Sequence, residues 1–493
     1  MPPALSLRDH ASAVGFGTSG VRALVCDLTP SVVSAYARAF VRRVSACEGP
    51  PAECVVGWDL RPSSPVIAAA VCAGLEREGV RPVIEGACPT PALALRAAHL
   101  RAPAIIITGS HIPFDRNGIK FYTPTGEITK ADEASIASMD AAALLEDETR
   151  LAGAVAVWSV RTRGPVGGVA AREYAARLAA VAGSGFTGMR IGVYQHSAAG
   201  RDLLAALLEQ VGAQVVPLGR SDAFIPIDTE VVSADDERMA AAWCAQHRLD
   251  AIVSTDGDGD RPWVCDERGA FLRGDLLGAL CARRLGADAV ATPVSSNSVV
   301  EACGAFGHVA RTRIGSPYVI EAMESLARAG WTRVVGYEAN GGFLTQSPLS
   351  VDGVELAPLP TRDSGLPILL ALKIAHERGA PLSALADMLP ARRTASGSLK
   401  GIPSTESSVF LSRLRADDAR LAEFLAFAGA LPVSRDETDG LRVTLSSGDV
   451  VHLRPSGNAP EFRCYTEATT QQEADALLAR ALQAIETRFH ARS

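Results

Sequence analysis

The chain has 493 residues, which predicts about three domains and is also compatible with two or four. With 47% hydrophobic and 21% charged residues, and no apolar run near the ~20 residues of a spanning helix, the composition excludes a mainly disordered or a membrane-embedded chain. The N-terminus does not resemble a secretory signal, and a net charge of −7 does not favour nucleic-acid binding. We therefore expect a cytoplasmic protein without membrane or nucleic-acid partners.

The cysteines and histidines do not predict a zinc site or a disulfide framework. None of the ten cysteines forms a C-x-x-C motif, and the nine histidines contain no H-E-x-x-H spacing. Most cysteines lie in apolar stretches, so we expect buried, reduced thiols.

A strand, loop, helix and strand pattern recurs three times along the chain. Its copies begin with the predicted strands Cys54–Gly57, Met189–Tyr194 and Ala289–Pro293. Such alternation predicts three related α/β domains in series. Later strands separated by glycine turns, closed by a helix from Gln471 to Arg488, predict a smaller antiparallel α+β domain. The predicted domains are 1–165, 166–270, 271–390 and 391–493.

The first glycine motif, Gly15-Phe-Gly-Thr-Ser-Gly20, fits the G-x-G-x-x-G pattern of dinucleotide sites. That site needs a strand before the glycines and a helix after them. Here the preceding residues are polar and residues 21–26 look like a strand, so the context excludes it. A plain turn remains, or a flexible loop that approaches an anion beside Arg22.

A polar loop follows the apolar strand 104–107. In Thr108-Gly-Ser-His111, Ser110 lies at the carboxyl end of a strand, the edge at which α/β sheets bind ligands. The threonine at position 108 excludes the G-x-S-x-G elbow of esterases. The alternative to a functional serine is one that caps a turn.

The next segment predicts a strand that bears Lys120. Asn117-Gly118 predicts a turn immediately before this strand. Because arginine stays protonated whereas the pKa of lysine can be tuned, Lys120 is a candidate for proton transfer. The alternative is a solvated strand residue.

The strongest local signal is Asp256-Gly-Asp-Gly-Asp-Arg261, flanked by predicted strands. Three carboxylates within five residues repel one another, and a hard divalent cation compensates for that repulsion. An EF-hand is excluded because Arg261 occupies the required glycine position and the flanks are not helical. A solvated acidic turn is the alternative.

Two later loops place polar side chains among glycines. Residues 336–343 carry Glu338 and Asn340, which could grip sugar hydroxyls or could belong to a simple turn. Residues 454–463 offer two arginines and loop amides for a phosphate, although either arginine could instead form a surface salt bridge.

Taken in this order, the loops resemble those of the α-D-phosphohexomutase superfamily, most closely its bacterial phosphomannomutase/phosphoglucomutase branch. The resemblance covers essentially the whole chain and implies four domains around a central cleft. The matching segments are Thr108–His111 with Asn117–Lys120 (phosphoserine loop), Asp256–Arg261 (metal loop), Glu338–Asn340 (sugar loop) and Arg454–Asn458 (phosphate loop).

The resemblance implies a mechanism and a role for each loop. Ser110 would be a phosphoserine whose oxygens share Mg²⁺ with three aspartates, and hexose 1,6-bisphosphate would be both intermediate and activator. Lys120 or His111 would handle the hydroxyl proton, and the fourth domain would pivot to serve both substrate orientations. The implied residues are Asp256, Asp258 and Asp260 for the metal, Arg22, Lys120 and Arg261 around the transferring group, Glu338 and Asn340 for the sugar, and Arg454, Ser456, Gly457, Asn458 and Arg463 for the phosphate that does not react.

This chain departs from the family pattern at positions that contact the sugar or the phosphate. Asn340 replaces a serine, Gly342 falls where histidine is common, and Ser316 falls where some members have histidine. Ala459 stands where the phosphate loop usually carries threonine.

We predict a monomeric or homodimeric enzyme that interconverts mannose 6-phosphate and mannose 1-phosphate. The alternatives are a phosphoglucomutase, a phosphoglucosamine mutase, a metal-dependent sugar phosphatase and a non-catalytic relative that binds sugar phosphates.

Overall fold

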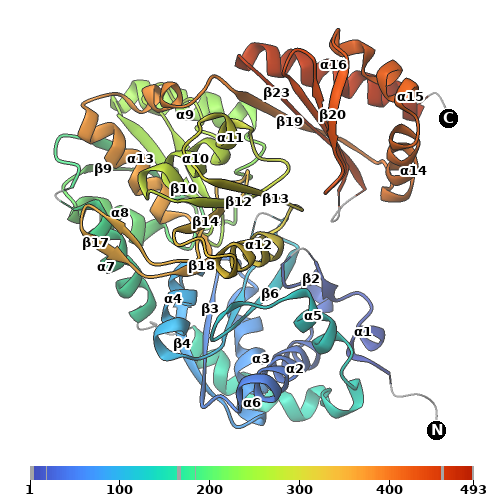
Figure 1. The fold of residues 1–493 in the computed structure, drawn as a ribbon. Helices are drawn as coiled ribbons and strands as arrows, with labels where there is room; N and C mark the ends of the chain where they lie inside the picture. Colours follow the sequence, from blue (N-terminus) through green and yellow to red (C-terminus); the bar gives the residue numbers. More distant parts are fainter. Residues whose placement is uncertain are drawn as a thin grey trace.

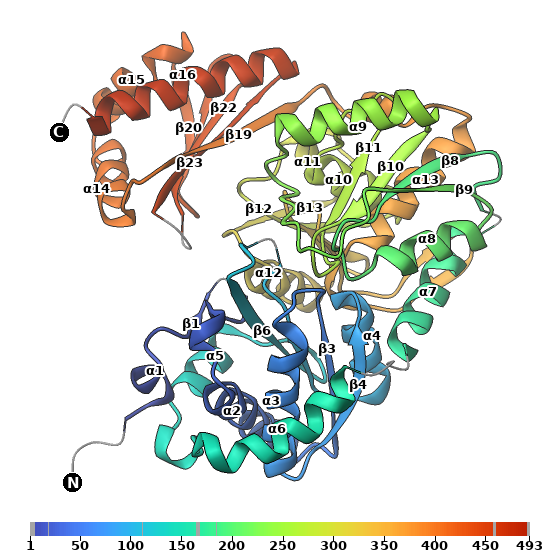
Figure 2. The same ribbon diagram turned by 180° about the vertical axis from the view of Figure 1, so that it is seen from behind.

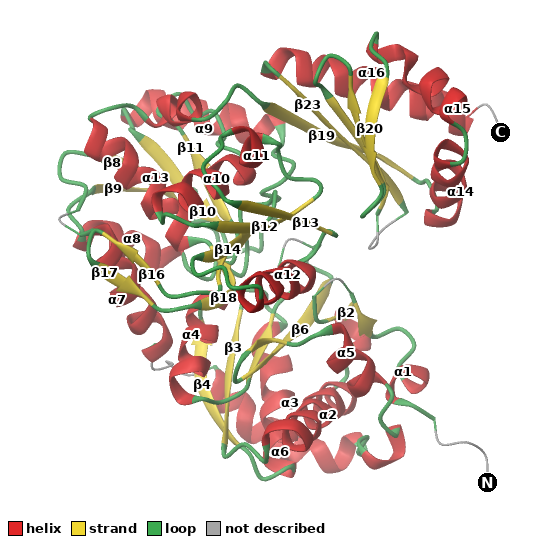
Figure 3. Cartoon of the chain, viewed as in Figure 1, coloured by secondary structure: helices red, strands yellow, loops and turns green. Residues whose placement is uncertain are grey.

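The computed structural model describes residues 5–17, 19–110, 112–163, 168–183, 185–456 and 460–490. Three α/β domains and a smaller C-terminal domain follow one another along the chain (Figure 1), as the sequence predicts. Helices cover the sheets (Figure 3). Among the described residues, no helix combines the length and the apolar character needed to cross a membrane.

Domain 1 contains a sheet in the order β1-β2-β6-β5-β3-β4, with β7 paired to β6. Its strands are β1 Gly15–Phe16, β2 Val21–Leu24, β3 Glu53–Trp58, β4 Arg81–Ala87, β5 Ala104–Ile107, β6 Arg116–Thr123 and β7 Gly126–Glu127. Its helices are α1 Leu7–His10, α2 Pro30–Glu48, α3 Ser64–Arg77, α4 Thr90–Leu100, α5 Lys130–Ala137 and α6 Glu148–Thr162, with short 3-10 turns at Val25–Asp27 and Ala141–Ala143.

The apolar strand β5 is buried on both faces. Ile105 and Ile107 belong to one hydrophobic core together with residues of α2 and α3, whereas Ile106 belongs to a second core with residues of α4. Because successive side chains of a strand point to opposite faces, a strand between two helical layers must be apolar throughout. This burial fixes where β5 ends and the polar loop begins.

Domain 2 has the sheet order β11-β10-β8-β9, in which β8, β9 and β10 are parallel and β11 is antiparallel. Its elements are α7 Val169–Ala182, β8 Arg190–Tyr194, α8 Arg201–Gln210, β9 Gln214–Leu218, α9 Ala234–His247, β10 Ala251–Thr255 and β11 Pro262–Cys265. Helix α7 packs against α4 of domain 1 (Figure 2).

Domain 3 has the sheet order β13-β12-β14-β15-β18 and a separate hairpin, β16-β17. Its strands are β12 Ala289–Pro293, β13 His308–Thr312, β14 Val334–Tyr337, β15 Phe343–Thr345, β16 Leu349–Val351, β17 Val354–Leu356 and β18 Leu359–Asp363. Its helices are α10 Gly274–Arg284, α11 Val299–Ala302, α12 Ser316–Arg328 and α13 Gly365–Arg378, followed by a 3-10 helix at Leu382–Met388.

Domain 4 is the antiparallel sheet β19-β23-β22-β21-β20 with helices against it. Its elements are β19 Arg393–Lys400, α14 Ser404–Arg415, α15 Asp418–Phe424, the 3-10 helix Leu425–Ala428, β20 Pro432–Asp436, β21 Leu441–Leu445, β22 Val450–Pro455, β23 Glu461–Ala468 and α16 Gln471–His490. Its main hydrophobic core is formed by apolar residues between Ile402 and Ile485, whereas one continuous core joins residues of domains 1, 2 and 3.

Two local predictions differ from the structure. Asn117 and Gly118 do not form a turn but lie inside β6. The asparagine side chain is buried and donates to Ser63 Oγ and Ser64 Oγ at 2.8 and 3.0 Å, so a tertiary contact overrides its turn preference. Gly118 is needed because a Cβ there would lie 2.4 Å from the Val21 carbonyl oxygen. The helix predicted in the third copy of the strand, loop, helix and strand pattern is only the four-residue α11.

The first glycine motif begins with β1, and its described residues belong to the hairpin between β1 and β2. These strands pair antiparallel, and Gly17 N–H donates to the Gly20 carbonyl at 2.9 Å, a geometry compatible with both alternatives given for this motif. The predicted domain boundaries near 165, 270 and 390 fall between the sheets and stay predictions.

We expect the core of domain 4 to lose stability in mild acid because of His452. This side chain is buried, and burial lowers its pKa from 6.5 to about 4. The unfolded chain therefore binds a proton at a pH at which the folded protein does not, and stability falls as the pH drops from 6.5 towards 4, by an order of 3 kcal/mol.

The variant His452→Gln is expected to flatten this pH dependence. The measurement is the free energy of unfolding from denaturant titrations between pH 4 and 7. His308→Gln, at an exposed histidine, is the control and should keep the wild-type slope. An unchanged slope in His452→Gln would contradict the assignment.

Candidate active site

Ser110 occupies a strained position in the loop that follows β5. Its φ is 51°, in the left-handed region that side chains other than glycine seldom adopt. Its N–H donates to Thr108 Oγ1 at 2.8 Å, and that hydroxyl donates to Asp59 Oδ2 at 2.8 Å. Asp59 follows β3, which is parallel to β5 and adjacent to it. Two neighbouring strand ends thus hold the serine in place.

The Arg61 side chain holds the same loop by hydrogen bonds to the backbone of the loop. Its guanidinium forms a fully buried ion pair with Asp59 at 3.2 Å and donates to the carbonyl oxygens of residues 110, 112, 113 and 116 at 2.5 to 3.0 Å. A Cβ at Gly109 would lie 2.5 Å from the guanidinium carbon, so only glycine fits there. The loop conformation therefore depends on a buried arginine from a different strand end.

Replacing Arg61 with methionine is expected to cost about 3–5 kcal/mol of folding free energy. The substitution leaves Asp59 buried and unpaired, along with several carbonyl oxygens. Denaturant unfolding measures the loss. Arg201→Met is the matched control, because Arg201 also donates to carbonyl oxygens but its carboxylate partner, Asp222, is 99% exposed. Equal losses in the two variants would contradict the role given to the buried ion pair.

The serine meets an acidic loop of domain 2, which we call the metal loop (residues 256–261). Ser110 Oγ donates to Asp256 Oδ2 at 2.7 Å, and both residues are buried. The metal loop begins where β10 ends, and Asp256 Oδ1 accepts from the N–H groups of Asp260 and Arg261 at 3.1 and 3.2 Å. The convergence of serine and carboxylates predicted from the sequence is thus present.

Domains 1 and 3 both contact the metal loop. Thr90, at the start of α4, donates from its N–H to the Asp258 carbonyl at 2.8 Å and from its hydroxyl to Asp258 Oδ2 at 3.0 Å. Ser364, just before α13, donates to the Gly259 carbonyl at 2.6 Å. Residues from three domains therefore fix the positions of the carboxylates.

Lys120, in the middle of β6, is an ion-pair partner of the metal loop. Its Nζ lies 2.6 Å from Asp258 Oδ2 and 2.6 Å from Asp260 Oδ2, and all three side chains are buried. Burial favours the neutral carboxyl, but Lys120 overrides it and lowers the pKa of Asp258. Burial, together with the neighbouring carboxylates, raises the pKa of Asp256 well above its usual range.

The three aspartates fit a divalent cation. Each offers a carboxylate oxygen within 4.8 Å of the others, and the Oδ1 atoms of Asp258 and Asp260 are buried without a hydrogen-bond partner among the described residues. Buried carboxylate oxygens without partners are costly, and hard cations such as Mg²⁺ take oxygen ligands of this kind.

Two arginines predicted to surround the transferring group lie at the same site. Arg22 donates to the Thr108 carbonyl at 2.6 Å, and burial lowers its pKa to about 10. Arg261 Nε lies 3.7 Å from Asp260 Oδ1. The site therefore combines a hydroxyl, three carboxylates and several cations. His111 lies outside the described residues.

A loop of domain 3, which we call the sugar loop (residues 338–342), follows β14 in the same way. Its Glu338 Oε2 lies 3.4 Å from an Arg362 nitrogen, and Arg362 also contacts Asp260 at 3.0 Å. Asn340 Oδ1 accepts from the Gly342 N–H at 3.0 Å, so the amide oxygen holds the loop closed.

The arginines of the predicted phosphate loop lie on neighbouring strands. Arg454 of β22 and Arg463 of β23 are directly paired in register. Their ion pairs are with Asp439 at 3.3 Å and Glu461 at 3.8 Å. Ser456 is buried at the end of β22, and Gly457 and Asn458 lie outside the described residues.

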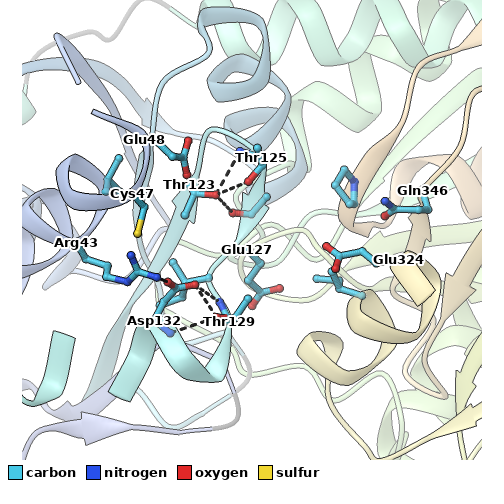
Figure 4. Close-up of a pocket in the computed structure, with 15 residues that line it drawn as sticks. Arg43, Cys47, Glu48, Thr123, Thr125, Glu127, Thr129, Asp132, Glu324 and Gln346 are labelled. Atoms are coloured by element: carbon cyan, nitrogen blue, oxygen red, sulfur yellow. Dashed lines mark hydrogen bonds and ion pairs between the residues drawn. The ribbon is translucent and has the colours of Figure 1, made fainter. Parts of the chain in front are cut away.

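A separate cavity of about 170 Å³ lies between domains 1 and 3 (Figure 4). Its lining includes Arg43, Glu127, Asp132 and Glu324, and none of the predicted site residues. Glu127 there accepts hydrogen bonds from Ser19 and Ser316, so it ties domain 1 to α12. The cavity is distinct from the candidate site.

Sequence reasoning missed three side chains that shape the site. The sequence could have indicated Asp59 and Arg61, because both follow β3. This strand is parallel to β5, so the loops after the two strands lie at the same edge of the sheet. Arg362 carried none, because it lies 102 residues after Asp260 and is brought there only by tertiary folding.

Together, the fold and the site define a class: a multidomain α/β protein with a buried serine against a carboxylate triad suited to a divalent cation, the arrangement of an enzyme that transfers phosphoryl groups. Family models match the chain along most of its length. They are phosphoglucomutase/phosphomannomutase α/β/α domain I at 13–143, domain II at 172–269, domain III at 273–392 and the C-terminal domain at 411–484. The chain belongs to the phosphoglucomutase/phosphomannomutase family.

Full-length relatives resemble the chain to different degrees. A phosphomannomutase of Sinorhizobium fredii is 46% identical over 470 residues, with 95% of this chain and 98% of the relative covered. A phosphomannomutase of Salmonella muenchen is 44% identical, with 94% of each chain covered. A phosphoglucosamine mutase of Sorangium cellulosum is 28% identical, with 96% of this chain and 92% of the relative covered.

A solved structure of a phosphoglucomutase/phosphomannomutase family protein from Burkholderia thailandensis has the same fold. The two align with a TM-score of 0.68 at 21% identity, and the alignment covers 96% of this chain and 97% of the other.

Proposed function

We propose that this protein interconverts mannose 6-phosphate and mannose 1-phosphate through a phosphoserine at Ser110 and a hexose 1,6-bisphosphate intermediate. The observation that carries the proposal is the 2.7 Å contact between Ser110 Oγ of domain 1 and Asp256 of domain 2. This contact supports the role of Ser110 as a phosphoryl carrier next to a cation site. The preference for mannose is supported by relatives named phosphomannomutase at 44 and 46% identity, against 28 to 30% for those named phosphoglucosamine mutase.

The proposed roles follow from charge. A phosphoserine carries about −1.5 to −2 charges at neutral pH, so it would be repelled by three neighbouring carboxylates. Asp256, Asp258 and Asp260 would hold Mg²⁺, which would supply neutralising charge and Lewis acidity at this point. Lys120 and Arg22 add positive charge from domain 1. Phosphoryl transfer depends mainly on such positioning and charge neutralisation.

Substrate binding is divided between two other domains in this proposal. Glu338 accepts hydrogen bonds from sugar hydroxyls, while Arg454 and Arg463 hold the phosphate that does not react. The hydroxyl of the substrate loses its proton to a group near Ser110, and Lys120 is the described candidate. Lys120 accepts this proton only as a neutral amine, after its ion pairs with Asp258 and Asp260 have broken, so the positive charge that it adds is that of the protonated product. Since both phosphate esters must present their free hydroxyl to Ser110, the intermediate turns over between the two transfers.

A panel of sugar 1-phosphates with a trace of glucose 1,6-bisphosphate tests this proposal. We expect the highest kcat/KM with mannose 1-phosphate and a smaller value with glucose 1-phosphate. Coupled detection of each 6-phosphate product gives the rates. Faster turnover of glucose or glucosamine phosphate would reassign the substrate, and steady release of inorganic phosphate without isomerised sugar would favour a phosphatase.

A further inference from the structure

Arg362 joins the metal loop to the sugar loop in the buried centre of the molecule. Its Nε and one terminal nitrogen lie 3.0 Å from Asp260 Oδ2, and its other terminal nitrogen lies 3.4 Å from Glu338 Oε2. Arg362 and Glu338 are 4% and 3% exposed. One guanidinium therefore sets the distance between a candidate metal ligand of domain 2 and the candidate sugar ligand of domain 3.

The backbone on either side of Arg362 is anchored by its neighbours. Thr361 Oγ1 lies 3.1 Å from the Tyr122 hydroxyl of β6, and Asp363 accepts a hydrogen bond from the Tyr174 hydroxyl of α7. Both tyrosines are buried. The arginine thus projects from a strand end that domains 1 and 2 hold on both sides, which limits how far its side chain can move.

The stem of Arg362 occupies the space beside Gly342. A Cβ built on Gly342 would lie 2.6 and 2.7 Å from the Cγ and Cδ atoms of Arg362, and real Cβ atoms do not approach that closely. The absence of a side chain at position 342 therefore has a steric reason. In this chain the cation beside the sugar loop comes from β18 instead of from the loop.

The other hydrogen bonds of the sugar loop involve its backbone. Gly341 N–H donates to the Glu338 carbonyl at 2.9 Å, and Glu338 N–H donates to the Gly342 carbonyl at 3.0 Å. These bonds close the turn but do not orient the Glu338 carboxylate. Arg362 forms an ion pair with that carboxylate, and Arg261 also interacts with it electrostatically.

We propose that Arg362 is a positioning residue that fixes the Glu338 carboxylate relative to Asp260 and thereby determines which hexose phosphate the sugar loop accepts. The inference rests on the proposed function. Mannose and glucose phosphates differ in the direction of a single hydroxyl, so discrimination between them requires a rigidly held acceptor. A site built to pair one hydroxyl penalises a substrate that leaves the buried acceptor unpaired.

The test uses Arg362→Lys, which keeps the charge but presents one ammonium that cannot span both carboxylates. We expect KM for mannose 1-phosphate to rise about tenfold while kcat changes by less than about threefold. The ratio of kcat/KM for mannose over glucose 1-phosphate should fall about tenfold. Calorimetric binding of both sugar phosphates to metal-free protein should show the same loss of discrimination.

Gly342→Ala provides a second variant, because its new methyl group displaces the stem of Arg362 without removing the guanidinium. It should shift the ratio in the same direction. The matched control is Arg311→Lys, a partly buried arginine of domain 3 that pairs with Glu301 and with backbone carbonyls. It should leave the ratio unchanged.

The proposal would be overturned if folded Arg362→Lys and Gly342→Ala both kept the wild-type ratio of kcat/KM for mannose over glucose 1-phosphate. An equal loss of kcat/KM for both sugars would also overturn it, because that result indicates a purely structural role. If the wild-type enzyme turned over no mannose phosphate, the proposed function would fail separately. The binding measurements with the two sugar phosphates would then still decide the role of Arg362.

Discussion

Ser110→Ala is expected to lower mutase turnover at least about a thousandfold, because the variant has no oxygen to carry the phosphoryl group between the two ends of the substrate. The fold should persist, since the substitution removes one hydrogen bond, to Asp256, worth about 1 kcal/mol. Coupled kinetics measure the loss. Mass spectrometry after incubation with hexose 1,6-bisphosphate should show the phosphoserine in the wild type and not in the variant.

Ser407→Ala is a suitable control for this experiment. Ser407 is a buried serine in domain 4 whose hydroxyl donates to the Pro403 carbonyl within its own helix. It should keep wild-type turnover and phosphorylation at Ser110. Near-normal turnover in Ser110→Ala would rule out the phosphoserine scheme.

Asp258→Asn is expected to weaken Mg²⁺ binding at least about tenfold, because an amide replaces one of three converging carboxylates. The readout does not require activity: a bound ion at one hundred times its Kd adds about 2.7 kcal/mol to stability, which thermal unfolding detects. The metal-free variant should still fold, since Lys120 keeps its ion pair with Asp260. The Mg²⁺ titration curve should move to higher concentrations.

Asp266→Asn controls for the loss of a buried charge in the same domain. Asp266 is buried and pairs with Arg268, outside the triad. Its variant should keep the wild-type Mg²⁺ titration. A titration of Asp258→Asn that matched the wild type would remove Asp258 from the ligand set.

The Ser110→Ala and Asp258→Asn experiments distinguish phosphoryl transfer from metal binding in the proposed reaction. Ser110→Ala should retain the Mg²⁺-dependent rise in thermal stability, since the triad remains intact, although its chemistry is lost. Asp258→Asn should need higher Mg²⁺ concentrations for the same rise in thermal stability and should also show lower turnover. Wild-type turnover in an Asp258→Asn variant whose Mg²⁺ binding is weakened would contradict the geometry, in which the Ser110 hydroxyl contacts Asp256 of the same triad.

The order of strands and polar loops along the chain could be predicted from the sequence, because it depends on patterns among neighbouring residues. Apolar strands such as 104–107, 251–255 and 334–337 end abruptly in polar residues, and the buried sheet dictates both features. Ser110, Asp256 and Glu338 could therefore each be assigned to the carboxyl end of a strand. The resemblance to a known family then joined these loops into one predicted site.

Asn117 and Gly118 show where local rules fail. Their sequence favours a turn, but an isolated preference of this kind is weaker than burial of the asparagine amide against two serines and close packing of the glycine on the Val21 carbonyl. Neither contact is visible in a window of neighbouring residues.

By itself, the sequence determined that the chain has three α/β units and one α+β unit. It also determined which loop each unit contributes to the site and the chemical character of that loop. These features could be predicted because periodicity and composition act over a few residues. Only the tertiary structure decided that Arg61 holds the serine loop by its carbonyls, that Lys120 pairs with the metal loop, and that Arg362 links that loop to Glu338. The physical reason is range. Buried charges form ion pairs with the groups that are nearest in space, and residues separated by about a hundred positions come into contact only after the domains have packed.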